Sequence, residues 1–211
     1  MSESLFSIDA ALAHLRRADP VLAGVIDEIG PFDWLQRSDP YLALVRTILF
    51  QQLAGPAANA IMRRFFVFYS DGEAPPAPAR LLETTDEQFR STGVSRQKAG
   101  YLRDLALHVA EGRLDFAALL SLSDDEVAQR IMAVRGLGEW SAHMFLMFHL
   151  GRPDVLPVAD LGMRQGMRIA YALPETPTPA KAREIGAPWA PHRSVGSWYM
   201  WRVTEPVAQD I

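Results

Sequence analysis

The sequence contains no cysteine among its 211 residues. This absence excludes a disulfide scaffold, a thiolate nucleophile, a zinc site with cysteine ligands and an iron–sulfur cluster held by cysteines. Hydrophobic residues make up 49% of the chain and charged residues 22%, a balance that excludes a disordered chain. A chain of this length can bury a sizeable core, as one large domain or two small lobes.

Lysine is nearly absent as well. Lys98 and Lys181 are the only two, and the other nineteen basic residues are arginines. Arginine binds phosphate oxygens in pairs and stacks on flat rings, although a surplus of arginine is also an ordinary composition bias. The scarcity of lysine limits any chemistry that needs a lysine amine as nucleophile.

The chain has no net positive charge, since its formal charge is −4. Residues 1–40 carry three arginines and seven carboxylates, so they account for the whole deficit. The negative total therefore does not exclude a nucleic-acid partner for the rest of the chain. It does predict few, local phosphate contacts and an affinity that falls only modestly with salt.

No segment resembles a membrane span or a signal peptide. The longest strongly apolar run, residues 144–150 (MFLMFHL), is interrupted by His149 and is far shorter than the roughly 20 residues that cross a bilayer. The N-terminus lacks a basic region followed by a long apolar stretch. We expect a monomer without membrane contact, in the cytoplasm or associated with the nucleoid.

Almost every segment has helical periodicity, so we predict an all-α fold. Ser123 and Glu126 have the spacing of a capping box at the start of one such helix. Only residues 154–158 (DVLPV) look extended, and Pro157 makes them a poor strand.

Residues 124–150 carry the most specific pattern. Two predicted helices flank the tight turn Gly136-Leu137-Gly138, where the glycines permit positive φ or close approach of the backbone. The turn gathers free N–H groups and the positive end of a helix dipole, which together suit a phosphate oxygen. A bare Gly-x-Gly turn would be only a helical hairpin, but the flanking pattern in residues 131–142 (IMAVRGLGEWSA) is more specific.

That pattern resembles the helix-hairpin-helix motif of the HhH-GPD DNA glycosylase superfamily. The residues LPVADLG at 156–162 resemble the proline-containing loop that ends in the family's catalytic aspartate, which is Asp160 here. Asp160 also suits a helix N-cap, a role compatible with catalysis. Asp154 is the competing carboxylate, but it precedes the Pro157 turn and matches the family position less well.

Three further stretches resemble the AlkA-like 3-methyladenine DNA glycosylase II branch of that superfamily. They are a Gln-Gln segment at 48–54 (ILFQQLA), the helix 93–106 (GVSRQKAGYLRDLA) and the segment 191–201 (PHRSVGSWYMW). The resemblance implies two helical lobes with the active-site cleft between them, in a short form without an N-terminal β domain. We expect lobe A at about 36–125, lobe B at about 126–211 with the N-terminal helices 1–35, and the hairpin motif at 124–150.

The resemblance also implies roles for particular residues. Asp160 is the expected catalytic residue, and Trp140, which occupies the position of the Schiff-base lysine in strand-nicking relatives, is an expected pocket wall. The expected base pocket consists of Trp140, Trp201, Met144, Gln51 and Phe50. The expected DNA contacts are Arg135, Gly136, Leu137, Gly138, Ser141, Gln52 and Leu53, with Gln52 or Leu53 as the side chain that fills the vacated base stack. Trp198, near Trp201, is expected in the core.

The activity that the resemblance implies is removal of alkylated bases from double-stranded DNA by hydrolysis, without strand cleavage. N3-methyladenine and N7-methylguanine are the expected bases, while N1-methyladenine, N3-methylcytosine, hypoxanthine and ethenoadenine stay open. No cofactor and no catalytic metal are expected, although hairpins of this family commonly hold a monovalent cation. The alternatives are a non-catalytic protein that binds DNA lesions and a strand-nicking lyase.

Overall fold

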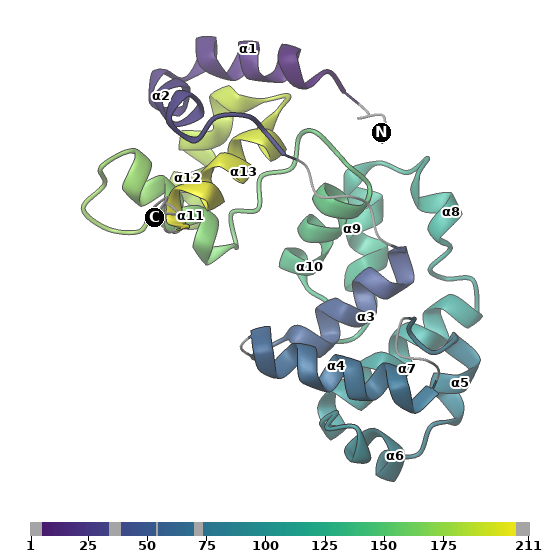
Figure 1. Ribbon diagram of the computed structural model, residues 1–211. Helices are drawn as coiled ribbons and strands as arrows, with labels where there is room; N and C mark the ends of the chain where they lie inside the picture. Colours follow the sequence, from purple (N-terminus) through teal and green to yellow (C-terminus); the bar gives the residue numbers. More distant parts are fainter. Residues whose placement is uncertain (1–5, 34–38, 54, 70–73, 206–211) are drawn as a thin grey trace. The chain divides into compact units, whose positions relative to one another are not determined.

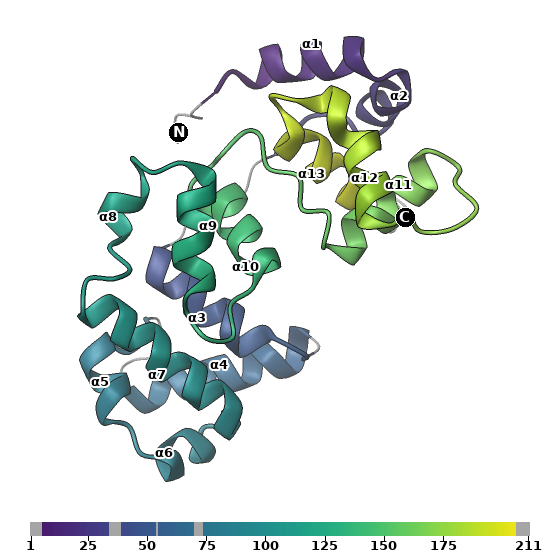
Figure 2. The ribbon, with the colours of Figure 1, turned by 180° about the vertical axis from the view of Figure 1, so that it is seen from behind.

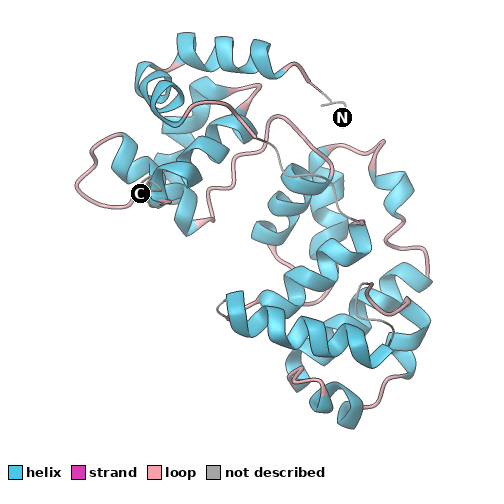
Figure 3. Ribbon diagram, in the orientation of Figure 1, coloured by secondary structure: helices cyan, strands magenta, loops and turns pink. Residues whose placement is uncertain are grey.

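The computed structural model describes residues 6–33, 39–53, 55–69 and 74–205, in which helices are joined by loops and turns (Figure 3). They contain no β-strand, which confirms the all-α prediction. No helix among them is long and apolar enough to cross a membrane. Ala54 of the Gln-Gln segment and residue 36, the expected start of lobe A, lie outside the described residues.

The chain divides into two compact units, each described by itself. Unit 1 consists of residues 1–37 and 146–211, and unit 2 of residues 38–145. The expected boundary at 125/126 thus differs from the observed one at 145/146, because the hairpin bonds to helices of unit 2. The bonds from Gln51 to Gly136 and from Arg135 to Asp104 make this connection.

Unit 1 contains five α-helices in its described part. They are α1 (Ile8–Ala18), α2 (Pro20–Ile29), α11 (Leu161–Ala170), α12 (Pro179–Gly186) and α13 (Arg193–Thr204), with the 3₁₀ turn η2 (Ala187–Trp189) before α13. A π-helical turn, η1 (Phe145–His149), lies at the boundary of the units. Figures 1 and 2 show α11 and α13 side by side from opposite directions.

The core of unit 1 is organised around one buried carboxylate. Asp19, only 7% exposed, caps α2 by accepting the N–H groups of Val21 and Leu22. Its other oxygen accepts the Tyr171 hydroxyl and, at 2.8 Å, the indole N–H of Trp189. A buried carboxylate needs such partners to offset its lost hydration. Asp19 therefore ties the N-terminal helices to the end of α11 and to η2.

Unit 2 contains eight α-helices in its described part. They are α3 (Pro40–Phe50), α4 (Gly55–Tyr69), α5 (Pro78–Glu83), α6 (Asp86–Ser91), α7 (Arg96–Ala110), α8 (Phe116–Leu119), α9 (Asp124–Met132) and α10 (Glu139–Met144). The predicted capping box at the start of α9 is confirmed, because Ser123 and Glu126 bond to each other's backbone N–H groups. Helices α3, α5 and α6 pack against α7, and α4 packs against α3 (Figure 1). With 15 residues each, α4 and α7 are the longest helices of this unit.

Candidate active site

Asp160 is the N-cap of α11, as its position in the sequence predicts. Its Oδ1 accepts the backbone N–H of Met163 at 2.7 Å. The same oxygen accepts the indole N–H of Trp201, also at 2.7 Å. Two donors on one oxygen fix the orientation of this half-buried carboxylate. The structure therefore brings together two of the predicted site residues, Asp160 and Trp201, which are 41 residues apart.

Close packing of α13 on α11 produces this contact. A Cβ on Gly166 would overlap the backbone carbonyl of Met200, so only glycine permits the two helices to approach this closely. A Cβ on Gly162 would lie 3.3 Å from Asp160 Oδ1 and 3.4 Å from Trp201 Cδ1. Small residues on one face of α11 therefore bring the indole of Trp201 within reach of Asp160.

Phe148 extends the aromatic surface beside Asp160. Its ring centroid lies 5.6 Å from that of Trp201, with the planes inclined at 37°. No site role for Phe148 was predicted from the sequence. The only sequence signal at Phe148 was its place in the apolar run 144–150. Because the π-helical geometry of η1 changes the helical register after Met144, α-helical spacing could not predict which way this ring points. Trp198, by contrast, lies in the core as expected.

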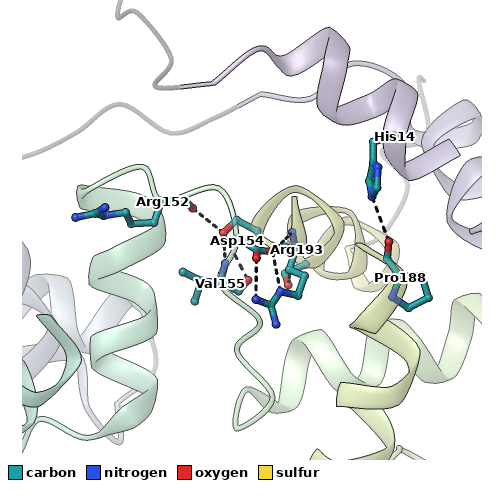
Figure 4. Close-up of polar contacts among 8 residues, drawn as sticks. His14, Arg152, Asp154, Val155, Pro188 and Arg193 are labelled. Carbon is teal, nitrogen blue, oxygen red and sulfur yellow. Dashed lines mark hydrogen bonds and ion pairs between the residues drawn. The ribbon is translucent and has the colours of Figure 1, made fainter. Parts of the chain in front are cut away.

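The chain that leads to Asp160 is bound to the start of α13. Asp154 and Arg193 form a bidentate ion pair, with Nε–Oδ1 at 2.7 Å and a second bond to Oδ2 at 2.8 Å (Figure 4). Asp154 also accepts the Arg193 backbone N–H at 3.2 Å. Asp154, which competes with Asp160 as the catalytic carboxylate on sequence alone, thus has a partner that gives it a structural role.

Ser194 holds the same chain from the next position. Its Oγ accepts the N–H of Val155 at 2.9 Å and donates to the carbonyl of Arg152 at 2.7 Å. Its own N–H donates to the carbonyl of Pro153 at 3.0 Å. Helix α13 therefore binds the segment before Asp160 at its first turn and Asp160 itself about two turns later.

The hairpin of unit 2 has the predicted turn, but its two glycines differ. Gly136 has φ +90°, and a Cβ there would overlap the ring of Tyr101. Gly138 caps α10 in an extended conformation without a side-chain bond, and a Cβ there would have no neighbour within 4 Å. Gly136 is thus required by the fold, while the space beside Gly138 can admit a ligand.

The other predicted DNA contacts of the hairpin are unequally accessible. Leu137 is 5% and Ser141 4% exposed, so neither side chain is available for a contact with DNA. Arg135 is exposed, and its backbone N–H donates to Asp104 Oδ2 at 2.7 Å. The hairpin can therefore offer backbone N–H groups and one guanidinium to a phosphate.

The segment after α3 forms a tight turn at residues 50–53. Gln51 has φ −52° and ψ 132°, Gln52 has φ +57°, and the N–H of Leu53 donates to the carbonyl of Phe50 at 3.3 Å. These values describe a type II β-turn, whose third residue is ordinarily glycine or asparagine. Gln52 is exposed and Leu53 is 38% exposed.

Gln51 points to the hairpin. Its amide Nε2 donates to the carbonyl of Gly136 at 2.7 Å, across 85 residues of sequence. This bond gives Gln51 a structural partner within unit 2, in addition to the pocket role predicted for it. No local pattern in the sequence indicated that bond.

The remaining predicted pocket residues also lie in unit 2. Trp140 is 43% exposed on α10, and Met144 is half-buried at the end of the same helix. The Phe50 ring lies 5.0 Å below the guanidinium of Arg46, a cation–π contact. Because the predicted pocket combines these residues with Asp160 and Trp201 of unit 1, its assembly stays a prediction.

Both lysines have partners in the structure. Lys98 Nζ donates to the carbonyl of Leu49 at 2.7 Å, and burial lowers its pKa. Lys181 Nζ pairs with Glu184 at 2.8 Å on α12. In the described part of the chain, no three His, Asp or Glu side chains gather in a way that could hold a metal ion.

Comparison with known proteins agrees with this geometry. The family described as HhH-GPD superfamily base excision DNA repair protein matches residues 45–191. DNA-3-methyladenine glycosylase 1 of Schizosaccharomyces pombe is 30% identical over 207 residues, which cover 96% of this chain and 90% of that protein.

Two solved structures are similar over nearly the whole chain. The 3-methyladenine DNA glycosylase of S. pombe in complex with abasic DNA has a TM-score of 0.81 at 31% identity, covering 92% of this chain and 95% of its own. The DNA-3-methyladenine glycosidase of Bacillus halodurans has a TM-score of 0.82 at 34% identity, covering 95% and 90%. The chain, with its hairpin and its aspartate at the start of α11, belongs to the HhH-GPD superfamily of base excision DNA repair proteins.

Proposed function

We propose that this protein is a DNA glycosylase that extrudes alkylated bases from double-stranded DNA and hydrolyses the bond between base and sugar, leaving an abasic site. The observation that carries the proposal is the Asp160 carboxylate held by Met163 and by the Trp201 indole, with Phe148 beside it. The 3-methyladenine specificity in the names of its relatives supports an alkylated substrate. The protein would act on chromosomal DNA in the cytoplasm or nucleoid, as a monomer.

Asp160 would act on the sugar. As the bond to the base breaks, the sugar develops positive charge of the oxocarbenium type, which a fixed carboxylate stabilises. The two hydrogen bonds to Oδ1 hold the carboxylate in place before the reaction, so little reorganisation is needed. Trp201 thus serves as a positioning residue for Asp160 as well as a wall for the base.

The aromatic side chains would favour a cationic base. Alkylation at a ring nitrogen gives the base a positive charge, which weakens its bond to the sugar. A cationic ring stacked on an indole gains about 0.5–2 kcal/mol of cation–π attraction. Trp201 and Phe148 in unit 1, and Trp140 in unit 2, supply such faces. N3-methyladenine and N7-methylguanine are the expected substrates.

Unit 2 would hold the DNA. The hairpin at Gly136–Gly138 would bind a backbone phosphate, and Leu53 would enter the vacated stack, because apolar side chains commonly serve as such wedges. Leu53 suits this role better than Gln52, since it is a large apolar side chain left exposed on a tight turn. Extrusion is needed because the bond to be cut is inaccessible inside the duplex.

The reaction would end at the abasic site. A lyase needs an amine that attacks the sugar, and the position of the lysine in strand-nicking relatives is held here by Trp140. Lys98 and Lys181 are bound to Leu49 and Glu184 respectively. Water would therefore be the nucleophile.

A monovalent cation at the hairpin stays part of the proposal. Backbone carbonyls suit such an ion, and the turn between α9 and α10 supplies several. Two of these carbonyls already accept hydrogen bonds: that of Gly136 from the Gln51 amide, and that of Val134 from the N–H of Leu137 at 3.1 Å. A cation would therefore either share these two oxygens with their donors or bind other carbonyls of the turn.

Chromatographic identification of the bases released from methylated genomic DNA tests the proposal. We expect free N3-methyladenine and N7-methylguanine, and no covalent DNA adduct after borohydride treatment. Release of no base by a protein that binds the lesion-containing duplex would favour a non-catalytic lesion sensor. A trapped adduct would instead show a lyase.

A further inference from the structure

Three side chains on one face of α7 contact the two turns of unit 2 that are proposed to hold the DNA. Lys98, Tyr101 and Asp104 follow each other at intervals of three residues, so they lie along one side of the helix. Lys98 reaches the end of α3, while Tyr101 and Asp104 reach the hairpin. Their span along the helix axis is about 9 Å, at 1.5 Å per residue.

The first contact fixes the start of the Phe50–Leu53 turn. The last carbonyls of a helix have no partner within the helix, and a cation there also interacts favourably with the helix dipole. Lys98 Nζ donates to one of them, the carbonyl of the fully buried Leu49, at 2.7 Å. Lys98 is half-buried, and burial lowers the pKa of its ammonium group.

The other contacts fix the hairpin. The Tyr101 ring lies against Gly136, in the space that a Cβ would take, and its hydroxyl accepts Gln97 Nε2 at 2.6 Å. Asp104 Oδ2 accepts the backbone N–H of Arg135 at 2.7 Å. Gln51 closes the arrangement by joining the turn directly to the Gly136 carbonyl.

We propose that Lys98, Tyr101 and Asp104 are positioning residues that keep the Phe50–Leu53 turn and the hairpin at the fixed separation needed to extrude a base from duplex DNA. This inference rests on the proposed function. A wedge side chain can fill the vacated stack only if its position relative to the bound phosphate is set in advance. The strained backbone of Gln52, with φ +57°, is consistent with a turn held by such contacts rather than by its own preference.

The test uses the full chain and a duplex with one N7-methylguanine, placed opposite either cytosine or a mismatched adenine. Misplacement of the wedge should matter most where the base is firmly paired. We expect Lys98→Met to slow single-turnover base release about tenfold or more opposite cytosine, but about threefold or less opposite adenine. Lys98→Arg, which can still donate to the Leu49 carbonyl, should restore the rate.

Lys181→Met is the matched control, because Lys181 is the only other lysine and forms an exposed pair on α12. Lys181→Met should leave the rate of base release unchanged on both duplexes. If Lys98→Met fails to fold in a circular dichroism melt, Asp104→Ala and Asp104→Asn replace it. Asp104→Ala removes the acceptor for the Arg135 N–H, so its base release should slow more opposite cytosine than opposite adenine. Asp104→Asn keeps an acceptor and should release the base at the wild-type rate.

Two results would overturn the inference: an unchanged rate on both duplexes, or the same loss on both. Fluorescence of a 2-aminopurine next to the lesion gives a second readout, since it reports unstacking without requiring hydrolysis. A wild-type protein that releases no base would instead refute the proposed function, so the two failures are distinguishable.

Discussion

At the scale of single residues, the site depends on hydrogen bonds whose partners are far apart in sequence. Trp201 and Asp160 are 41 residues apart, and Gln51 and Gly136 are 85 apart. Local rules predicted that Asp160 would cap a helix and that Gly136 would turn the hairpin. They could not predict the distant donors, because those follow from how helices pack rather than from spacing along the chain.

Trp201→Phe isolates the contribution of the indole N–H. The ring stays, but Asp160 loses one of its two donors on Oδ1. A hydrogen bond to a charged group contributes about 1.5–3 kcal/mol, so we expect kcat to fall about tenfold to a hundredfold with little change in KM. Trp198→Phe is the control, since Trp198 packs in the core and should affect stability rather than kcat. Equal kcat losses in both variants would contradict the role of the N–H.

We expect the stability of the protein to depend on pH through His192. Burial lowers the pKa of His192 from the usual 6.5, and the neighbouring His14 lowers it further, while Asp154 raises it. The ring centroids of His14 and His192 are 5.4 Å apart. Below pH 6.5 the unfolded chain therefore takes up a proton more readily than the folded one, so stability is lost as the pH falls. Denaturant unfolding at pH 8 and pH 5 should show a smaller loss for His192→Gln than for the wild type. An equal loss in both proteins would exclude this histidine as the cause.

At the scale of elements, the helices and their caps are the part of the fold best predicted by sequence. Ser123 and Glu126 form the expected capping box, and Asp160 caps α11. The role of Phe148 was not predictable, since a π-helical turn changes the register there. The assignment of the hairpin to unit 2 was also unexpected, because side-chain bonds to α3 and α7 determine it.

The approach of α13 to α11 depends on Gly166. Its Cβ would overlap the Met200 carbonyl, which is backbone and cannot rotate away. Overpacking lowers the free energy of unfolding by about 1–3 kcal/mol, and we expect a loss near the upper end of this range for Gly166→Ala. The higher helix propensity of alanine, worth roughly 1 kcal/mol, should offset part of that loss. Because the helices must separate, base release should also slow.

Gly24→Ala on α2 is the control for that substitution. A Cβ on Gly24 has no neighbour within 4 Å, so alanine there should raise the free energy of unfolding by up to about 1 kcal/mol. Thermal unfolding of both variants compares the two cases. An equal gain in stability for both variants would show that the packing of α11 on α13 does not require glycine at position 166.

At the scale of the whole molecule, charge sets how DNA is bound. The chain has a net charge of −4, confined to the first forty residues, and the hairpin presents one arginine with backbone N–H groups. We expect a shallow salt dependence, with a slope of log K against log salt no steeper than about −4, which corresponds to about four phosphates or fewer. Fluorescence anisotropy of a labelled abasic duplex between low and high salt measures it. A slope near −8 would require a basic surface that this composition does not indicate.

In the proposed function, Asp160, held by α11 and α13, drives hydrolysis of the glycosidic bond. The most direct test is single-turnover release of N7-methylguanine from a duplex by the wild type and by Asp160→Asn, which keeps an oxygen for the two donors. We predict that the asparagine variant is slower by about a hundredfold or more, while its affinity for an abasic duplex changes by about threefold or less. Base release by Asp160→Asn at the wild-type rate would contradict the account.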